Sequence, residues 1–332
     1  MMRRGIYCAA WAQHQARRCP FGRAVRTFAS EANNSHGAVV STEWVRANVD
    51  RIKVIDASWS LGKRSQHTVK LPGAIYFDID EIADKRTWLP HMLPTTSMFA
   101  AKMEELGITN EDQLLVYDES DGQFVASARV WWTFRVFGHN DVKVLAGGLK
   151  NWPKGLQIQK TAADPKEHGL KFAVRKEPAL VWSKYDMLDN LSPTNSDQSQ
   201  IVDARSRERF YAQVDEPRAD IPRGSIPDSM NVPFGSLFQT THSEQGEPMH
   251  VLKSPSELQR IFEQAGVDVT KKVVASCGSG VTASVVALAL NELGHSRAAV
   301  YDGSWTEWAI AADTPKVVKR ISAAQAAAAF AT

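Results

Sequence analysis

The sequence predicts an α/β protein with two similar domains in tandem, each a mainly parallel sheet with helices on both faces. Three observations lead to this prediction. The chain of 332 residues is long enough for two domains of ordinary size. Short apolar runs alternate along it with helically periodic segments, a pattern typical of parallel sheets. Motifs of the first half also return in the second half in the same order, which indicates a duplicated domain.

The repeated motifs cover a strand ending in an acid, a helix, a second strand, and a final pair of Gly-His and Gly…Trp motifs. The matched segments are 54–57 with 201–204, 98–108 with 256–267, 114–117 with 273–276, and 138–152 with 294–308. The glycines and tryptophans of the last pair keep one constant spacing between the halves. The duplication is therefore in register.

These repeats set the expected domain boundaries. We expect an N-terminal domain at residues 36–156 and a C-terminal, catalytic domain at 179–320. The linker between them, 157–178, is charged and poor in large apolar side chains. The alanine-rich end, 321–332, is expected to be a flexible tail.

Residues 1–28 have the composition of a mitochondrial presequence. They hold six arginines, and no acidic residue occurs before Glu31. The run Arg26-Thr27-Phe28-Ala29-Ser30 resembles a matrix-peptidase site cut after Phe28. We therefore expect a mitochondrial matrix protein, with a second, cytosolic pool left open. The alternative is a basic tail that binds an acidic partner.

Removal of this leader changes the charge and the cysteine content. The formal net charge of +2 falls to about −4, so we expect no direct binding to nucleic acid or to anionic membranes. The uncharged stretch 273–290 has the length of a membrane span, but its central glycines and small polar residues favour a strand, a loop and a buried helix. Cys8 and Cys19 would leave with the leader. Cys277 would then be a free thiol.

Cys277 directly follows the apolar run 273–276, at the carboxyl end of a predicted strand, where parallel sheets carry their catalytic loops. Gly278 and Gly280 allow the backbone to turn successive N–H groups inward. A helix is expected from about residue 283 to 293, and such a nest at a helix N-terminus stabilises an anion. We therefore expect a nucleophilic thiolate, with a buried structural cysteine as the alternative.

The segments Cys277-Gly278-Ser279-Gly280-Val281-Thr282-Ala283 and Tyr301-Asp302-Gly303-Ser304-Trp305-Thr306-Glu307-Trp308 resemble the tandem-domain rhodanese family. The resemblance covers roughly residues 38–318. It implies two rhodanese-like domains, of which only the C-terminal one carries the cysteine. Asp118 stands at the matching N-terminal position and cannot carry sulfur. The N-terminal domain is thus expected to be non-catalytic and to shape the cleft between the domains.

Within this family the loop is most similar to that of the 3-mercaptopyruvate sulfurtransferase type. Thiosulfate-preferring members carry basic side chains just after the cysteine, where this chain has Gly278 and Ser279. The mercaptopyruvate type holds the carboxylate and keto oxygen of its substrate with two arginines. The resemblance of segment 203–218 gives these roles to Arg209 and Arg218, whose planar forks suit a carboxylate.

The resemblance implies a sulfurtransferase that needs no cofactor and no metal. Cys277 would take sulfur from 3-mercaptopyruvate as a persulfide, pyruvate would leave, and thioredoxin, another thiol or cyanide would accept the sulfur. Ser279 is expected to be catalytic. The rest of the loop is expected to bind the substrate and the persulfide: Gly278, Gly280, Val281 and Thr282.

Two alternatives stay open: a thiosulfate sulfurtransferase, and a relay protein that passes persulfide to protein partners for tRNA thiolation. Some members pair the serine with a histidine just before the first Pro-Gly-Ala, but here that residue is Lys70. His67 is expected at the surface, so the proton donor to pyruvate is unassigned. A related phosphatase is excluded because Ala283 replaces its arginine. A dinucleotide site is excluded because the third glycine is missing.

Overall fold

The computed structural model describes residues 37–60, 71–158 and 171–319. The predicted presequence, His67, Lys70, most of the linker and the predicted tail lie outside these residues. Within the described residues, no helix is both long and apolar enough to cross a bilayer.

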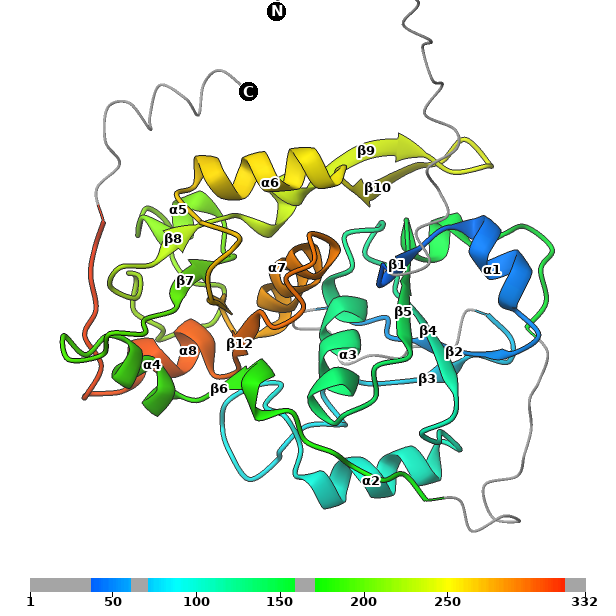
Figure 1. Ribbon diagram of the computed structural model, residues 1–332, viewed down its shortest axis with the longest axis horizontal. Coiled ribbons are helices and arrows are strands. Elements are labelled where there is room, and N and C mark those ends of the chain that lie inside the picture. Colours follow the sequence, from blue (N-terminus) through cyan, green and yellow to red (C-terminus); the bar gives the residue numbers. More distant parts are fainter. Residues whose placement is uncertain (1–36, 61–70, 159–170, 320–332) are drawn as a thin grey trace, which may run out of the picture. The chain divides into compact units, whose positions relative to one another are not determined.

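Two five-stranded parallel sheets form the framework (Figure 1). The N-terminal sheet has the order β1-β5-β4-β2-β3 and the C-terminal sheet the order β6-β12-β11-β7-β8. The N-terminal strands are β1 (Val39–Val40), β2 (Ile52–Asp56), β3 (Ile75–Tyr76), β4 (Gln113–Tyr117) and β5 (Val142–Leu145). The C-terminal strands are β6 (Val181–Trp182), β7 (Gln200–Asp203), β8 (Met230–Asn231), β11 (Val273–Ser276) and β12 (Ala299–Tyr301). Strand for strand the two orders are the same, which confirms the predicted duplicated α/β fold.

Helices cover both faces of each sheet, as predicted. The N-terminal helices are α1 (Thr42–Asn48), α2 (Thr96–Glu105), α3 (Val125–Val136) and the 3-10 turn η1 (Gly148–Asn151). The C-terminal helices are α4 (Lys184–Asn190), α5 (Arg207–Phe210), α6 (Pro255–Gln264), α7 (Val281–Glu292) and α8 (Ser304–Ile310), with the turns η2 (Pro178–Leu180) and η3 (Phe234–Leu237). The predicted segments 98–108 and 256–267 correspond to α2 and α6. A capping box of Ser254 and Glu257 and a proline in the first turn begin α6.

The alternation of side chains along a strand divides the core into layers. On β4, Leu114 and Val116 face a large central cluster, whereas Leu115 and Tyr117 face an outer cluster covered by α1. On β11 the central cluster receives Val273 and Ala275, and Val274 faces a second outer cluster with Trp308 of α8. The central cluster contains residues of both halves and therefore joins them.

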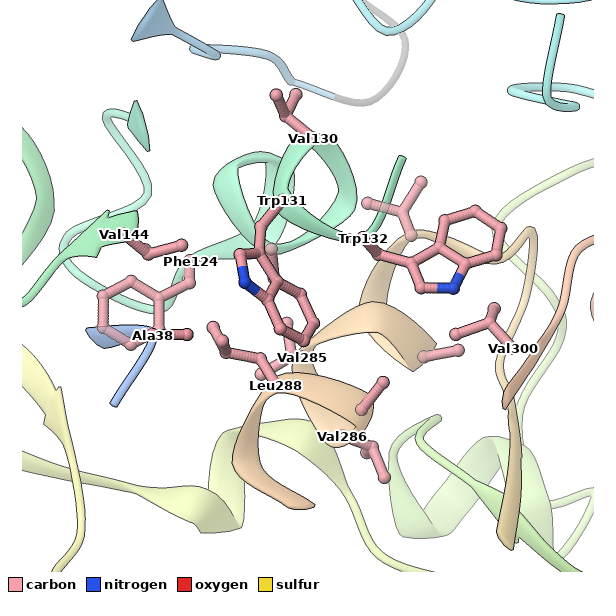
Figure 2. Packing of buried hydrophobic residues seen from close by; sticks show 14 of the residues in the cluster. Ala38, Phe124, Val130, Trp131, Trp132, Val144, Val285, Val286, Leu288 and Val300 are labelled. Carbon is pink, nitrogen blue, oxygen red and sulfur yellow. The ribbon is translucent and has the colours of Figure 1, made fainter. Parts of the chain in front are cut away.

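Helices α3 and α7 lie side by side within this central cluster (Figure 1). Figure 2 shows Trp131 of α3 directed toward Val285 and Leu288 of α7, with Trp132 beside Val300 of β12. Both tryptophans are fully buried. At about 25 cal/mol per Å² over about 150–250 Å², each contributes at most about 4–6 kcal/mol. The uncharged stretch 273–290 is thus β11, a loop and the buried part of α7, as predicted.

A two-stranded antiparallel hairpin, β9 (Phe238–His242) with β10 (Pro248–Leu252), lies outside both sheets. The sequence analysis did not predict it. It contacts the N-terminal half through the His250 N–H, which donates to the Asp121 carbonyl over 2.8 Å. The hairpin therefore adds a second connection between the halves.

Candidate active site

Cys277 lies directly after β11, a central strand of the C-terminal sheet, and its residue is 2% exposed. Its N–H donates to Ser304 Oγ over 3.1 Å, and its carbonyl accepts from the Trp305 N–H over 3.0 Å. The next carbonyl, of Gly278, accepts from the N–H and the hydroxyl of Thr306, over 2.9 and 2.6 Å. The start of α8 therefore fixes the backbone of the cysteine loop.

The loop leads directly into α7, which begins at Val281 and ends at Glu292. The sequence placed this helix at about 283–293, so its predicted start was wrong by two residues. Gly280 explains the difference, because its left-handed backbone (φ 77°) turns the chain straight from the loop into the helix. The first N–H groups of a helix have no acceptor within it. The N-terminus of α7 therefore offers N–H groups and a positive dipole end near Cys277.

The two predicted arginines come together at this loop. Arg209, on α5, pairs with Glu216, and its Nη2 would lie 2.8 Å from a Cβ atom built on Gly278. Burial lowers the pKa of Arg218, and the charge of Arg209 adds to this, while Cys277, Asp80 and Glu216 act in the opposite direction. Both guanidinium groups therefore lie within electrostatic reach of each other, and Arg218 within that of Cys277.

The other predicted site residues differ in whether they can offer a side chain or only backbone groups to the cysteine loop. Ser279 is 7% exposed, within the turn between β11 and α7. Val281 is buried in the central cluster, so its backbone, not its side chain, is available to the loop. Gly278 and Gly280 likewise offer only backbone, and Thr282 is half-buried on the first turn of α7.

Glu216 holds Arg209, a role that the sequence analysis did not assign. Its side chain is 4% exposed and accepts from Arg209 through one oxygen and from Arg205 through the other, over 2.7 Å. Arg205 is itself buried, paired with Asp203 over 2.7 Å and stacked on Trp305. The only signal in the sequence was the alternation of acids and arginines after the strand that ends at Asp203.

A histidine of the N-terminal half, His91, also reaches the site and was missed. Its Nε2 lies 3.2 Å from Arg218 Nη2, and its Nδ1 lies 2.7 Å from Asp80 Oδ1. Trp59 donates its indole N–H to the other oxygen of Asp80 over 2.8 Å. These residues are far apart in sequence from the cysteine motif. The only hint in the sequence was a histidine within an apolar segment.

Arg129 of α3 ties this part of the N-terminal half to the cysteine loop. It pairs with Asp302 over 2.7 Å and donates to the carbonyls of Gly280, over 3.2 Å, and of His91. The second oxygen of Asp302 accepts from the Leu93 N–H over 2.8 Å. The site therefore consists of segments from both halves.

The loop of the N-terminal half that corresponds to the cysteine loop carries an acidic side chain, Asp118, in place of the cysteine. The carboxylate of Asp118 is buried at the start of α3, where it accepts from the N–H groups of Ala126 and Ser127 over 2.9 and 2.7 Å. It also accepts from the Ser120 N–H over 3.0 Å. An acidic side chain thus stabilises this helix N-terminus, at the place equivalent to Cys277.

Comparison with known proteins agrees with this geometry. A model of the rhodanese-like domain matches residues 41–154 and again residues 186–311. The chain is similar to "Thiosulfate/3-mercaptopyruvate sulfurtransferase 1, mitochondrial" of Arabidopsis thaliana, with 37% identity over 90% of this chain and 84% of that protein. It is also 38% identical to the 3-mercaptopyruvate sulfurtransferase of Escherichia coli (strain K12), over 83% of this chain and 96% of the relative.

A solved structure shows the same fold. The crystal structure of SseA from Escherichia coli, described as a 3-mercaptopyruvate sulfotransferase with the rhodanese fold, has a TM-score of 0.63 and 35% identity to this chain. The match covers 81% of this chain and 99% of that one.

Proposed function

The chain belongs to the family of rhodanese-like domains and is a sulfurtransferase, and from this premise we propose that Cys277 carries the transferred sulfur. The donor is 3-mercaptopyruvate and the acceptor is a thiol. Thioredoxin is the acceptor we favour, and cyanide serves in the laboratory. The reaction releases pyruvate.

The observation that carries the proposal is that Arg209 Nη2 lies next to Gly278 and that Arg218 is within electrostatic reach of both Arg209 and Cys277. A 3-mercaptopyruvate molecule has a carboxylate and a keto oxygen, and two guanidinium groups can bind both. The thiolate of Cys277 attacks the donor sulfur, the carbon–sulfur bond of the donor breaks, and its electron pair forms the enolate of pyruvate. The guanidinium groups stabilise this negative charge, and a proton then converts the enolate to pyruvate.

The cysteine loop would hold the persulfide that remains. The N–H groups from Gly278 to Thr282, at the start of α7, are suited to its negative charge. The side chain of Ser279 lies in the same turn and is our candidate for a further hydrogen bond to the bound sulfur. A thiol attacks the outer sulfur and restores Cys277, so the two half-reactions follow ping-pong kinetics.

The N-terminal domain is non-catalytic in this proposal, because Asp118 occupies the place of the cysteine. It contributes His91 and Arg129 to the site. We assign the two domains to residues 36–156 and 179–320, with the linker at 157–178, and both family matches fall inside the domain ranges. The predicted presequence at 1–28 and the name of the mitochondrial relative support a location in the mitochondrial matrix.

A thiosulfate sulfurtransferase is the second candidate, because the Arabidopsis relative is named for both donors. The neutral Gly278 and Ser279 disfavour the thiosulfate dianion relative to a loop with basic side chains. Transfer of the persulfide to a protein partner, as in a relay toward tRNA thiolation, would use the same Cys277 chemistry.

The test is a comparison of kcat/KM for 3-mercaptopyruvate and for thiosulfate, with cyanide as the acceptor. We expect a clear preference for 3-mercaptopyruvate. Mass spectrometry after donor alone should find one additional sulfur atom on the wild-type chain and none on Cys277→Ser. Full turnover by Cys277→Ser would contradict the role of this cysteine, and a preference for thiosulfate would overturn the assigned donor.

A further inference from the structure

We propose that His91 is a positioning residue of the sulfur-transfer site: as a neutral imidazole held by Asp80, it accepts a hydrogen bond from Arg218 and fixes that guanidinium beside Cys277. The proposal rests on the proposed function, since it assigns to Arg218 the binding of the donor.

The ring of His91 is held on three sides. Asp80 Oδ1 lies 2.7 Å from Nδ1, and Arg218 Nη2 lies 3.2 Å from Nε2. The ring of Trp59 meets the imidazole edge-on, with the ring centroids 5.0 Å apart, and its N–H fixes the second oxygen of Asp80. The residue is 7% exposed, so water has little access to it. The ring can therefore turn only if these contacts break.

The backbone of His91 is also fixed. Its φ of 61° lies in the left-handed region, which a residue with a side chain adopts at a cost of order 1–3 kcal/mol. Its carbonyl accepts from Arg129, whose guanidinium also pairs with Asp302 and bonds Gly280 in the cysteine loop. One buried arginine thus fixes both His91 and the loop that carries Cys277.

The hydrogen-bond partners determine the tautomer. A guanidinium has only donors, so His91 Nε2 must accept from Arg218 and carries no proton. The ring proton is then on Nδ1, which faces the Asp80 carboxylate at the 2.7 Å separation from Oδ1. The bond from His91 is the largest cause that lowers the pKa of Asp80, and the bond from Trp59 adds to it. An ionised Asp80 and a neutral, Nδ1-protonated His91 are therefore mutually consistent.

The test uses two substitutions in the full chain. His91→Phe keeps an aromatic ring but has no acceptor, so KM for 3-mercaptopyruvate should rise by about 10- to 100-fold at neutral pH, the factor for a lost hydrogen bond to a charged group. His91→Gln retains an acceptor oxygen that can still receive the Arg218 N–H. It should keep KM within a few-fold of the wild type.

His139→Phe is the matched control, because His139 is equally buried but packs against Phe134 and Phe172 in the N-terminal half. It should leave KM unchanged. An unchanged KM in His91→Phe, or a KM in His91→Gln as high as in His91→Phe, would overturn the proposal. Because sulfur loading of Cys277 at saturating donor should survive in both His91 variants, failure of the wild type to load sulfur would instead refute the proposed function.

Discussion

The residues around Cys277 act through partners that the cysteine motif does not contain. Arg209 is held by Glu216, and Arg218 faces His91. That Cys277 and both arginines belong to one region could be predicted, because they lie in short motifs. The contacts of Glu216 and His91 could not: Glu216 meets Arg209 only when the loop between them folds, and His91 meets Arg218 from the other half of the chain. At the residue scale, therefore, the sequence names the candidate groups and the fold determines how they are held.

Gly278→Ala should impair donor binding without unfolding the protein. The new Cβ would lie 2.8 Å from Arg209 Nη2, and Arg209 cannot move freely because it is paired with the buried Glu216. The backbone of Gly278 lacks the left-handed conformation that would strain an alanine. We expect KM for 3-mercaptopyruvate to rise about tenfold and the free energy of unfolding to change by less than about 1 kcal/mol.

The control for this change is Gly235→Ala, because no atom lies within 4 Å of a Cβ at that position. Steady-state kinetics and urea unfolding of both variants give the comparison. Equal KM values in the two variants would show that donor binding does not depend on the position of Arg209 next to Gly278.

At the scale of elements, regular patterns were predicted and irregular ones were not. The segment 256–267 was predicted as a helix, and α6 (Pro255–Gln264) lies there. The hairpin of β9 and β10 was missed because most of its residues are half-buried or exposed, so no apolar run marks it. The start of α7 depends on one backbone angle at Gly280, which a pattern of apolar residues does not reveal.

Gly280→Ala should destabilise the start of α7. A Cβ on this residue would lie 2.7 Å from the Asp302 carbonyl oxygen and 2.8 Å from Arg129 Nη1, and the left-handed backbone adds strain. Gly246→Ala is the matched control, with a similar φ of +79° but no atom within 4 Å. The control should cost about 1 kcal/mol in the free energy of unfolding, as is usual for alanine in this conformation. Gly280→Ala should cost about 2–3 kcal/mol more, because backbone atoms must move.

Urea unfolding measures both glycine variants, and persulfide formation on Cys277 gives the functional comparison. Gly280→Ala should also slow sulfur loading, since the loop and the helix N-terminus shift together. If the two variants lost the same free energy of unfolding, the close contact between the new Cβ and the Asp302 carbonyl would not destabilise the protein.

At the scale of the whole molecule, the two halves share one core and one site. The central cluster contains α3 and α7, and within it the Arg129–Asp302 pair connects the halves through a contact that is almost fully buried. The duplication could be predicted from repeated motifs. The way the halves pack could not, because buried residues lie on every side of both α3 and α7 and no single apolar face marks the contact.

Arg129→Met should destabilise the whole molecule and impair the site at the same time. It leaves the buried carboxylate of Asp302 without its partner, and the carbonyls of Gly280 and His91 lose a donor. Removing one member of a buried ion pair costs about 3–5 kcal/mol. We expect a loss of this size in urea unfolding, together with a higher KM for 3-mercaptopyruvate.

Arg135→Met, on the same helix, is the control: it removes a hydrogen bond between the halves but no buried ion pair. Arg135 also bonds across, to the Ser296 carbonyl over 2.8 Å, but it is only half-buried and takes part in no ion pair of the described residues. Its loss should cost about 1 kcal/mol. In the double variant Arg129→Met/Asp302→Leu no unpaired charge remains. Its loss of unfolding free energy should therefore be smaller than the sum of the losses in the two single variants, by at least about 1 kcal/mol. Additive losses would mean that the pair does not couple the halves.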